Sequence, residues 1–198
     1  MRKGHAQANS HRVARLTDIA RVDELHALVH RVFGELRIDP PSGVLSETVA
    51  DFAARLKSET CLVVEADGRL IASIFCAPDG DALYVGRLAV HAGWRRRGIA
   101  SALIEAAKDE ARRIGARRIT LGARIALTGN VALFRHHGFA VVRATCHPGF
   151  TVPTSYDMEL VLAAAPAHDP EKACPGLDPG CEAVSRLREA LARSHRVD

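Results

Sequence analysis

The chain has 198 residues, of which 47% are hydrophobic and 25% charged, so it can form one globular domain with a buried core and is not disordered throughout. Its formal net charge of +4 favours anionic partners but does not separate nucleic acid from a small phosphorylated ligand. No apolar run approaches the roughly 20 residues that cross a bilayer. The basic, polar start, MRKGHAQANSHR, has no apolar segment after it, so we expect a cytoplasmic protein without a secretory signal or a membrane partner.

The first half of the chain predicts a short strand, two helices and a β-hairpin. Residues 1–12 are expected to be a flexible arm, and the strand lies within 13–18. Apolar side chains recur at helical spacing over 19–33, after Thr17 or Asp18 as the N-cap, and again from Ser46 to Leu56. Two apolar runs on either side of Asp67-Gly68 predict a hairpin over 61–78, because Asp-Gly favours a tight turn.

The second half alternates strands and helices. In chain order we expect a strand over 82–90, a helix over 98–114, a strand over 117–125, a short helix over 130–136, and two closing strands over 139–146 and 155–162. This order predicts an α/β (α+β) fold with a mixed sheet over residues 13–162. The Ala-, Pro- and Gly-rich start of residues 163–198 predicts a linker, which is followed by either an amphipathic helix or a disordered tail.

The five cysteines do not form a close Cys-x-x-Cys pair. Cys61, Cys76 and Cys146 lie in apolar, strand-like segments, so we expect them to be small core residues that stay reduced. Cys174 and Cys181 flank the turn sequence PGLDPG, where a disulfide or zinc site is the less favoured alternative. No spacing of His, Cys and Asp suggests a metal site, and we predict none.

Residues 94–101, WRRRGIAS, lie between a strand and a helix. The first N–H groups of a helix lack intrahelical partners and carry partial positive charge, and small residues let an anion approach them closely. The spacing is neither that of a dinucleotide-binding glycine motif nor that of a P-loop. By itself the run therefore allows three interpretations: a phosphate cradle, a solvated helix start, or a basic patch on nucleic acid.

Other features favour the phosphate cradle. The segment RLAVHAGWRRRGIASALI resembles the acyl-CoA-binding motif of the GNAT superfamily of N-acetyltransferases, in which an apolar strand end leads to Gln/Arg-x-x-Gly-x-Gly/Ala at a helix start. Arg95, Gly98 and Ala100 occupy the three fixed positions. ALFRHHGF at 132–139 resembles a later segment of the family, and LTDIARVDELHALVHRVF resembles its opening strand and helix. The resemblance covers roughly residues 13–162.

The resemblance implies a mostly antiparallel sheet with acyl-CoA bound where the central strands splay apart. Backbone groups of the apolar triplet would pair with the pantetheine amides, and N–H groups from Arg96 to Ser101 would hold the pyrophosphate. Asn130 and Phe134 would lie beside the pantetheine and sulfur. The implied acetyl-CoA-binding residues are Leu88, Ala89, Val90, Arg95, Arg96, Arg97, Gly98, Ile99, Ala100, Ser101, Asn130 and Phe134.

The catalytic groups remain unassigned by sequence. Many relatives have a tyrosine, which protonates the departing thiolate, where this chain has Phe134, and a glutamate base on the preceding strand, which here has no carboxylate. The alternative candidates are Tyr156, His147 and His136. For the two histidines, a turn or a solvated helix end is the alternative interpretation.

The predicted function is transfer of an acetyl group from acetyl-CoA to a primary amine of a small molecule or peptide by direct attack, without a metal. Arg87 and Arg124 either hold an acidic substrate or pair with structural carboxylates. A CoA-binding regulatory module without activity is the alternative function. Nucleic-acid binding is disfavoured because no helix-turn-helix with base-reading residues accompanies Arg95–Arg97. A homodimer is left open.

Overall fold

The computed structural model describes residues 12–163. The predicted arm over 1–11, the linker and tail, and the pair Cys174 and Cys181 lie outside the described residues.

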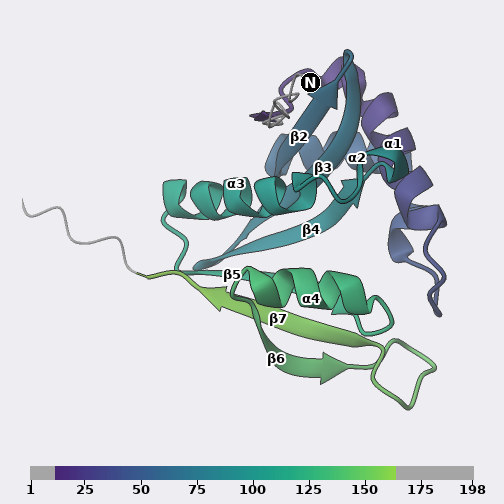
Figure 1. The fold of residues 1–198 in the computed structure, drawn as a ribbon, viewed down its shortest axis with the longest axis vertical. Coiled ribbons are helices and arrows are strands. Elements are labelled where there is room, and N and C mark those ends of the chain that lie inside the picture. Colours follow the sequence, from purple (N-terminus) through teal and green to yellow (C-terminus); the bar gives the residue numbers. More distant parts are fainter. Residues whose placement is uncertain (1–11, 164–198) are drawn as a thin grey trace, which may run out of the picture. The chain divides into compact units, whose positions relative to one another are not determined.

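Seven strands form one mixed sheet in the order β1-β2-β3-β4-β5-β7-β6 (Figure 1). All neighbours are antiparallel except β4 and β5. This confirms the predicted α/β (α+β) fold with a mixed, mostly antiparallel sheet. The elements are β1 (Val13–Arg15), the short 3-10 turn η1 (Ile19–Arg21), α1 (Val22–Gly34), η2 (Gly43–Ser46), α2 (Val49–Ser58), β2 (Thr60–Ala66), β3 (Arg69–Asp79), β4 (Ala82–Val90), η3 (Ala92–Trp94), α3 (Ile99–Arg113), β5 (Arg118–Arg124), α4 (Thr128–His136), β6 (Ala140–Thr145) and β7 (Ser155–Val161).

Helices cover both faces of the sheet (Figure 1). On one face, α1 and α2 bury Leu25, Val29 and Phe52 against the inner side chains of β2 and β3. On the other, α3 and α4 bury a second core that includes Leu103 and Phe134. Each helix is amphipathic, so packing its apolar side on the sheet removes that side from water. None of the helices within residues 12–163 combines the length and the apolar character that a membrane crossing needs.

Polar side chains determine where the first helices begin. Asp18 accepts a hydrogen bond from the N–H of Ala20 at 2.9 Å and so caps η1. The second helix begins at Val49 rather than at Ser46, because Thr48 and Asp51 form a reciprocal capping box. Ser46 instead belongs to η2. The loop between α1 and α2 is thereby fixed over one end of β4.

β4 leaves its neighbour β5 after a few residues. The two strands pair only at Ala82–Tyr84 with Arg118–Thr120. The register with β3 then shifts between Ser73 and Phe75, and Arg87 on the opposite strand takes a positive φ of 51°. A bulge of this kind bends a strand and redirects its side chains. The rest of β4 therefore diverges from β5, and the candidate functional site lies in this fork.

Two of the three predicted core cysteines are buried, and the third is not. Cys61 and Cys76 are buried on neighbouring strands but belong to the cores on opposite faces of the sheet. Burial raises the pKa of the Cys76 thiol to about 12, so this thiol stays protonated. The prediction for Cys146 was wrong, because it follows the end of the edge strand β6 and is exposed.

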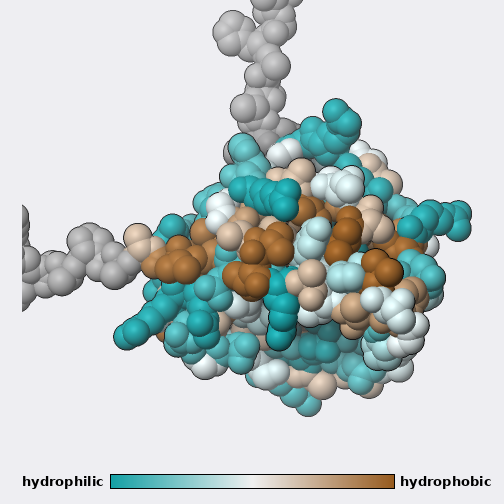
Figure 2. Space-filling model, turned by 90° about the horizontal axis from the view of Figure 1, so that it is seen from below, coloured by the Kyte–Doolittle hydropathy of each residue, from teal (hydrophilic) through white to brown (hydrophobic). Residues whose placement is uncertain are grey.

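The edge of the sheet formed by β6 and β7 exposes apolar side chains. Figure 2 views the molecule from this side and shows apolar residues spread among polar ones. Val142 on β6, Val152 in the loop before β7 and Val161 at the end of β7 are exposed. The homodimer left open by the sequence stays a prediction.

Candidate acyl-CoA and acceptor site

A cavity of about 550 Å³ fills the fork between β4 and β5. One end reaches the start of α3, and the other reaches the α1–α2 loop and the loop before β7. Its walls come from helices, strands and loops on both sides of the fork: Val32, Phe33, Leu36, Ile38, Ser42, Gly43, Val44, Ile74, Tyr84, Val85, Gly86, Arg87, Leu88, Val90, Arg95, Ala100, Leu121, Gly122, Ala123, Arg124, Leu127, Asn130, Leu133, Phe134, His147 and Ser155. The cavity thus joins six of the twelve predicted donor residues, Leu88, Val90, Arg95, Ala100, Asn130 and Phe134, to both predicted substrate arginines.

The start of α3 leaves its first N–H groups without a side-chain cap from the described residues. Gly98 is its N-cap with φ 76°, and within the described residues no side chain caps this end and no acidic residue lies in the first turn. An added Cβ at Gly98 would meet no atom within 4 Å, so the glycine is required by its left-handed backbone and not by crowding within the protein. The open space is where a phosphate would approach the first N–H groups of the helix.

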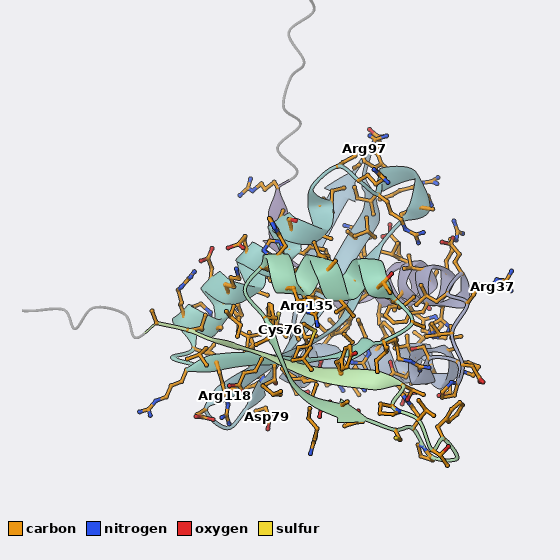
Figure 3. The ribbon with its side chains drawn as sticks, turned by 60° about the horizontal axis from the view of Figure 1, so that its bottom comes forward. Arg37, Cys76, Asp79, Arg97, Arg118 and Arg135 are labelled. Carbon is orange, nitrogen blue, oxygen red and sulfur yellow. The ribbon has the colours of Figure 1, made fainter. Side chains whose placement is uncertain are left out.

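Two arginines of the Arg95–Arg97 run have partners within the protein. Arg95 donates from Nε to the carbonyl of Val90 at 3.1 Å and forms a 2.8 Å ion pair with Glu35. The guanidinium of Arg97 lies 4.7 Å from the ring centroid of Trp94, and Figure 3 shows it at the outer edge of the turn before α3. Trp94 itself packs against the core under α3. An anion at this helix start would therefore be held mainly by backbone groups.

A short hydrogen-bonded chain links α3 to the end of α4. His137 lies 3.0 Å from the Ser101 hydroxyl through Nε2, and 2.8 Å from Glu105 through Nδ1. Glu105 also pairs with Lys108, and the hydrogen bonds from Lys108 and His137 lower the pKa of its carboxyl group. This chain fixes the Ser101 side chain in the first turn of α3.

Apolar side chains predominate in the middle of the cavity. Leu88 and Val90 line it from β4, and Asn130 and Phe134 line it from α4. The Ala89 side chain points to the opposite face, where it is fully buried beneath α1. Phe134 packs edge-on against Phe139 at 5.8 Å between ring centroids. This wall suits an uncharged chain that passes between the diverging strands.

Arg87 pairs with a carboxylate that sequence reasoning missed. Its Nε donates to Glu47 at 2.8 Å, and its Nη2 contacts the same carboxylate. Arg55 binds Glu47 from the other side at 2.8 Å. Burial raises the pKa of Glu47, but hydrogen bonds from the two guanidinium groups outweigh it and leave the pKa lowered. Of the two alternatives for Arg87, the structural pair is the one found.

Replacing Glu47 with glutamine is expected to lower the free energy of unfolding by roughly 1.5–3 kcal/mol at pH 7, because two partly buried guanidinium groups lose their counter-charge. Since the folded-state pKa of Glu47 is lowered, the native pair stabilises above the unfolded-state pKa of 4.5 and is lost as pH falls below it. Urea unfolding measures the change. Glu35→Gln, at an exposed pair, is the control and should change stability by ~0.5 kcal/mol or less.

Arg124 and His147 lie together in the wall of the cavity. Arg124 Nη1 is 3.4 Å from His147 Nε2. A guanidinium only donates, so Nε2 is the accepting nitrogen and the ring proton lies on Nδ1, next to the Thr154 hydroxyl. Thr154 also accepts from the His147 backbone N–H at 3.1 Å, which holds this loop residue in place.

The other catalytic candidates lie elsewhere. His136 and Tyr156 line a separate, shallower hollow beside α4 together with Thr128 and Arg135. Tyr84, which sequence reasoning missed, lines the main cavity instead. Its ring lies across Gly86, where an added Cβ would be 3.1 Å from Cε1. The signal in the sequence was a glycine two residues after a tyrosine in a strand, which leaves room for the ring.

Among residues 12–163, no group of three or more His, Cys, Asp or Glu side chains is arranged to hold a metal ion.

Comparisons with known proteins agree with this geometry. The model of the acetyltransferase (GNAT) family matches residues 23–139. The chain is similar in structure to an acetyltransferase of the GNAT family from Streptococcus pneumoniae, with TM-score 0.65 and 17% identity over 77% of this chain and 99% of that one. The search of curated sequences gives no match.

Two further solved structures are similar to the chain. The PaiA N-acetyltransferase from Thermoplasma acidophilum, in complex with coenzyme A, gives TM-score 0.65 and 15% identity over 77% of this chain and 99% of that one. A ribosomal-protein-alanine N-acetyltransferase from Brucella melitensis gives 0.61 and 15% over 76% and 99%. At these identities the structures support the fold, and the family model covers more than half of the sequence. The chain belongs to the acetyltransferase (GNAT) family.

Proposed function

We propose that the protein transfers the acetyl group of acetyl-CoA to a primary amine of a small molecule or peptide. The observation that carries this proposal is the single cavity that joins the open N-terminus of α3 to His147 and Arg124 through the fork of β4 and β5. Acetyl-CoA would supply an activated acetyl group, and the protein would supply alignment of the two reactants and a group that accepts a proton.

The donor end would be held mainly by the backbone. N–H groups from Arg96 to Ser101, next to the open space at Gly98, would bind the pyrophosphate. The edge of β4 after Tyr84, which has no strand partner on the β5 side among the described residues, would pair with the pantetheine amides. Leu88 and Phe134 would enclose the thioester end in apolar surroundings.

His147 is proposed as the base. In its accepting state, Nε2 faces the cavity, and it would take the proton that the attacking amine loses as the N–C bond forms and the C–S bond breaks. The departing thiolate would receive a proton from water or from the Tyr84 hydroxyl, the phenol that lines the same cavity. Glu47 is a poor base, because its two arginine partners lower the pKa of its carboxyl group and so weaken its affinity for a proton.

His147→Gln is expected to lower kcat roughly 100-fold, the usual contribution of a positioned proton acceptor, and to leave CoA affinity unchanged. The release of free thiol from acetyl-CoA measures the rate. His136→Gln is the matched control, because His136 lines the separate hollow and should keep full activity. Equal rates for both variants would contradict the role of His147.

A regulatory module that binds CoA without turnover is the second candidate. It is favoured by Phe134, which stands in the cavity wall and has no proton to give. A broad panel of amines tests the two functions. Release of thiol with any amine supports the enzyme, whereas tight CoA binding without release across the panel supports the module.

A further inference from the structure

Arg124 carries a charge that its protein neighbours leave uncompensated. Within residues 12–163, no carboxylate lies within 4.0 Å of its guanidinium, and its buried Nε has no hydrogen-bond partner. Its contact with His147 is long, at 3.4 Å. Burial lowers the pKa of Arg124, and the charge of Asp39 opposes this effect. Buried hydrogen-bond donors normally have partners, so the unpaired Nε of Arg124 points to a ligand group that the protein does not itself provide.

Arg87 differs from Arg124 because its charge is paired with a carboxylate. Both guanidinium groups lie on the same cavity, but Arg87 is bound by Glu47 and stacks 5.8 Å from the Phe75 ring centroid. Arg87 is therefore a satisfied structural residue. Arg95, the third arginine of the cavity wall, is paired with Glu35 and with the carbonyl of Val90. Of these three, Arg124 is left as the guanidinium that can form a two-pronged contact with an anionic group.

The neighbour of Arg124 limits where that anionic group sits on the substrate. His147 Nε2, the proposed acceptor of the amine proton, is 3.4 Å from Arg124 Nη1. A molecule that reaches both groups must carry its amine and its anion very close together. An α-amino acid does so, because its amine and carboxylate share one carbon atom.

The remaining wall selects for an apolar side chain. The end of α1 and the loop that follows present aliphatic and aromatic groups to the cavity, namely Val32, Phe33, Leu36, Ile38 and Val44. Among the lining residues between 32 and 44, Ser42 is the one with a polar side chain, and Tyr84, Asn130 and Ser155 are the uncharged polar residues elsewhere in the cavity wall. A cavity of this kind excludes a strongly charged side chain and accommodates an apolar one.

We infer that the acceptor is an apolar α-amino acid, whose carboxylate binds the guanidinium of Arg124 and whose amine faces His147. The inference rests on the proposed function for the acetyl donor and adds the chemical class of the acceptor.

The test measures binding of amino acids to the full chain saturated with CoA, by titration calorimetry. The probes are leucine, methionine and phenylalanine, together with leucinamide and 3-methylbutylamine, which keep the amine and side chain of leucine but lack its carboxylate. At least one amino acid should bind, and the two leucine analogues should bind at least ~10-fold more weakly than leucine, since a charged hydrogen-bonded contact is removed.

Variants of Arg124 identify the contact. Arg124→Met should weaken amino-acid binding at least ~10-fold without changing CoA affinity, and Arg124→Lys should recover part of the loss by restoring the charge. Arg118→Met is the matched control, because Arg118 lies at the far end of the same strand, beside Asp81, and Figure 3 shows it near the β3–β4 turn. It should bind amino acids as the parent does.

The outcomes separate this inference from the proposed function. If no amino acid binds, if leucinamide binds as well as leucine, or if the Arg124 and Arg118 variants behave alike, the inference is overturned. Binding that depends on Arg124 without thiol release would support the amino-acid site and contradict the transferase. Equal acetylation of leucine by parent and Arg124→Met would support the transferase and contradict the amino-acid site.

Discussion

Gly98→Val is expected to weaken CoA binding by roughly 30-fold or more. Gly98 has φ 76°, and a left-handed conformation costs an L-residue about 1–2 kcal/mol, more for a branched side chain. The variant can relieve this strain only by moving the turn that presents the N–H groups of α3. The new side chain would also occupy the open space at Gly98 through which a phosphate approaches. Equilibrium binding of CoA, by calorimetry or by competition, measures the loss.

Gly115→Val is the matched control at the other end of the same helix. Gly115 has φ 74°, and an added Cβ there also meets no atom within 4 Å. The two variants therefore carry nearly the same backbone strain and should lose similar stability. CoA affinity should fall only for Gly98→Val. If both variants bind CoA equally well, the pyrophosphate is not held at the start of α3, and the proposed site is misplaced.

Glu110→Gln is expected to lower the free energy of unfolding by about 2–3 kcal/mol at pH 7. Glu110 lies in α3 with its side chain 5% exposed, and it binds Arg113 and Thr60 and contacts Arg15 on β1. Hydrogen bonds from Arg113 contribute most to lowering the pKa of this carboxyl from 4.5 to about 2. A difference of this size is worth about 3 kcal/mol, reduced here because both arginines are about half exposed.

The effect of Glu110 depends on pH with a definite sign. Because the folded-state pKa is lowered, the carboxylate stabilises the protein fully above the unfolded-state value of 4.5 and loses its effect as pH falls towards 2. Urea unfolding of parent and variant should therefore differ most at neutral pH and converge in acid. Asp109→Asn, at an exposed pair on the same helix, should cost ~0.5 kcal/mol or less at every pH. If the free energies of unfolding of the parent and of Glu110→Gln differ by the same amount at every pH, a charge effect is contradicted.

The fold could be predicted because its signals are local, and the proposal for the donor end rests on a local signal as well. Helical spacing, the Asp67-Gly68 turn and the strand–turn–helix around Gly98 each lie within a few neighbouring residues. The prediction that Cys146 is a core residue was wrong because the place of a strand within the sheet is not a local signal. The segment before Cys146 has the apolar content of a strand, but the sequence does not show that this strand, β6, is at the edge of the sheet.

The acceptor end depends on contacts between distant residues. Glu47 and Arg87 are 40 positions apart, and Arg124 and His147 are 23 apart. These pairs meet because the bulge at Arg87 bends β4 and because the loop before β7 folds back over β5. No periodicity or motif in the sequence reports such a contact. Arg87 and Arg124 therefore looked equivalent in sequence, and only their surroundings distinguish them.

The short pairing of β4 with β5 has a consequence for the stability of the whole sheet. Three backbone pairs join the half made of β1 to β4 to the half made of β5, β7 and β6, and side chains under α3 and α4 supply the rest of the connection. A ligand bound along the open edges of β4 and β5 would bridge the two halves and stabilise their association. The cellular concentration of such a ligand would then determine how often the two halves separate. The supply of acetyl-CoA would thereby govern the lifetime of the folded protein as well as its rate of acetyl transfer.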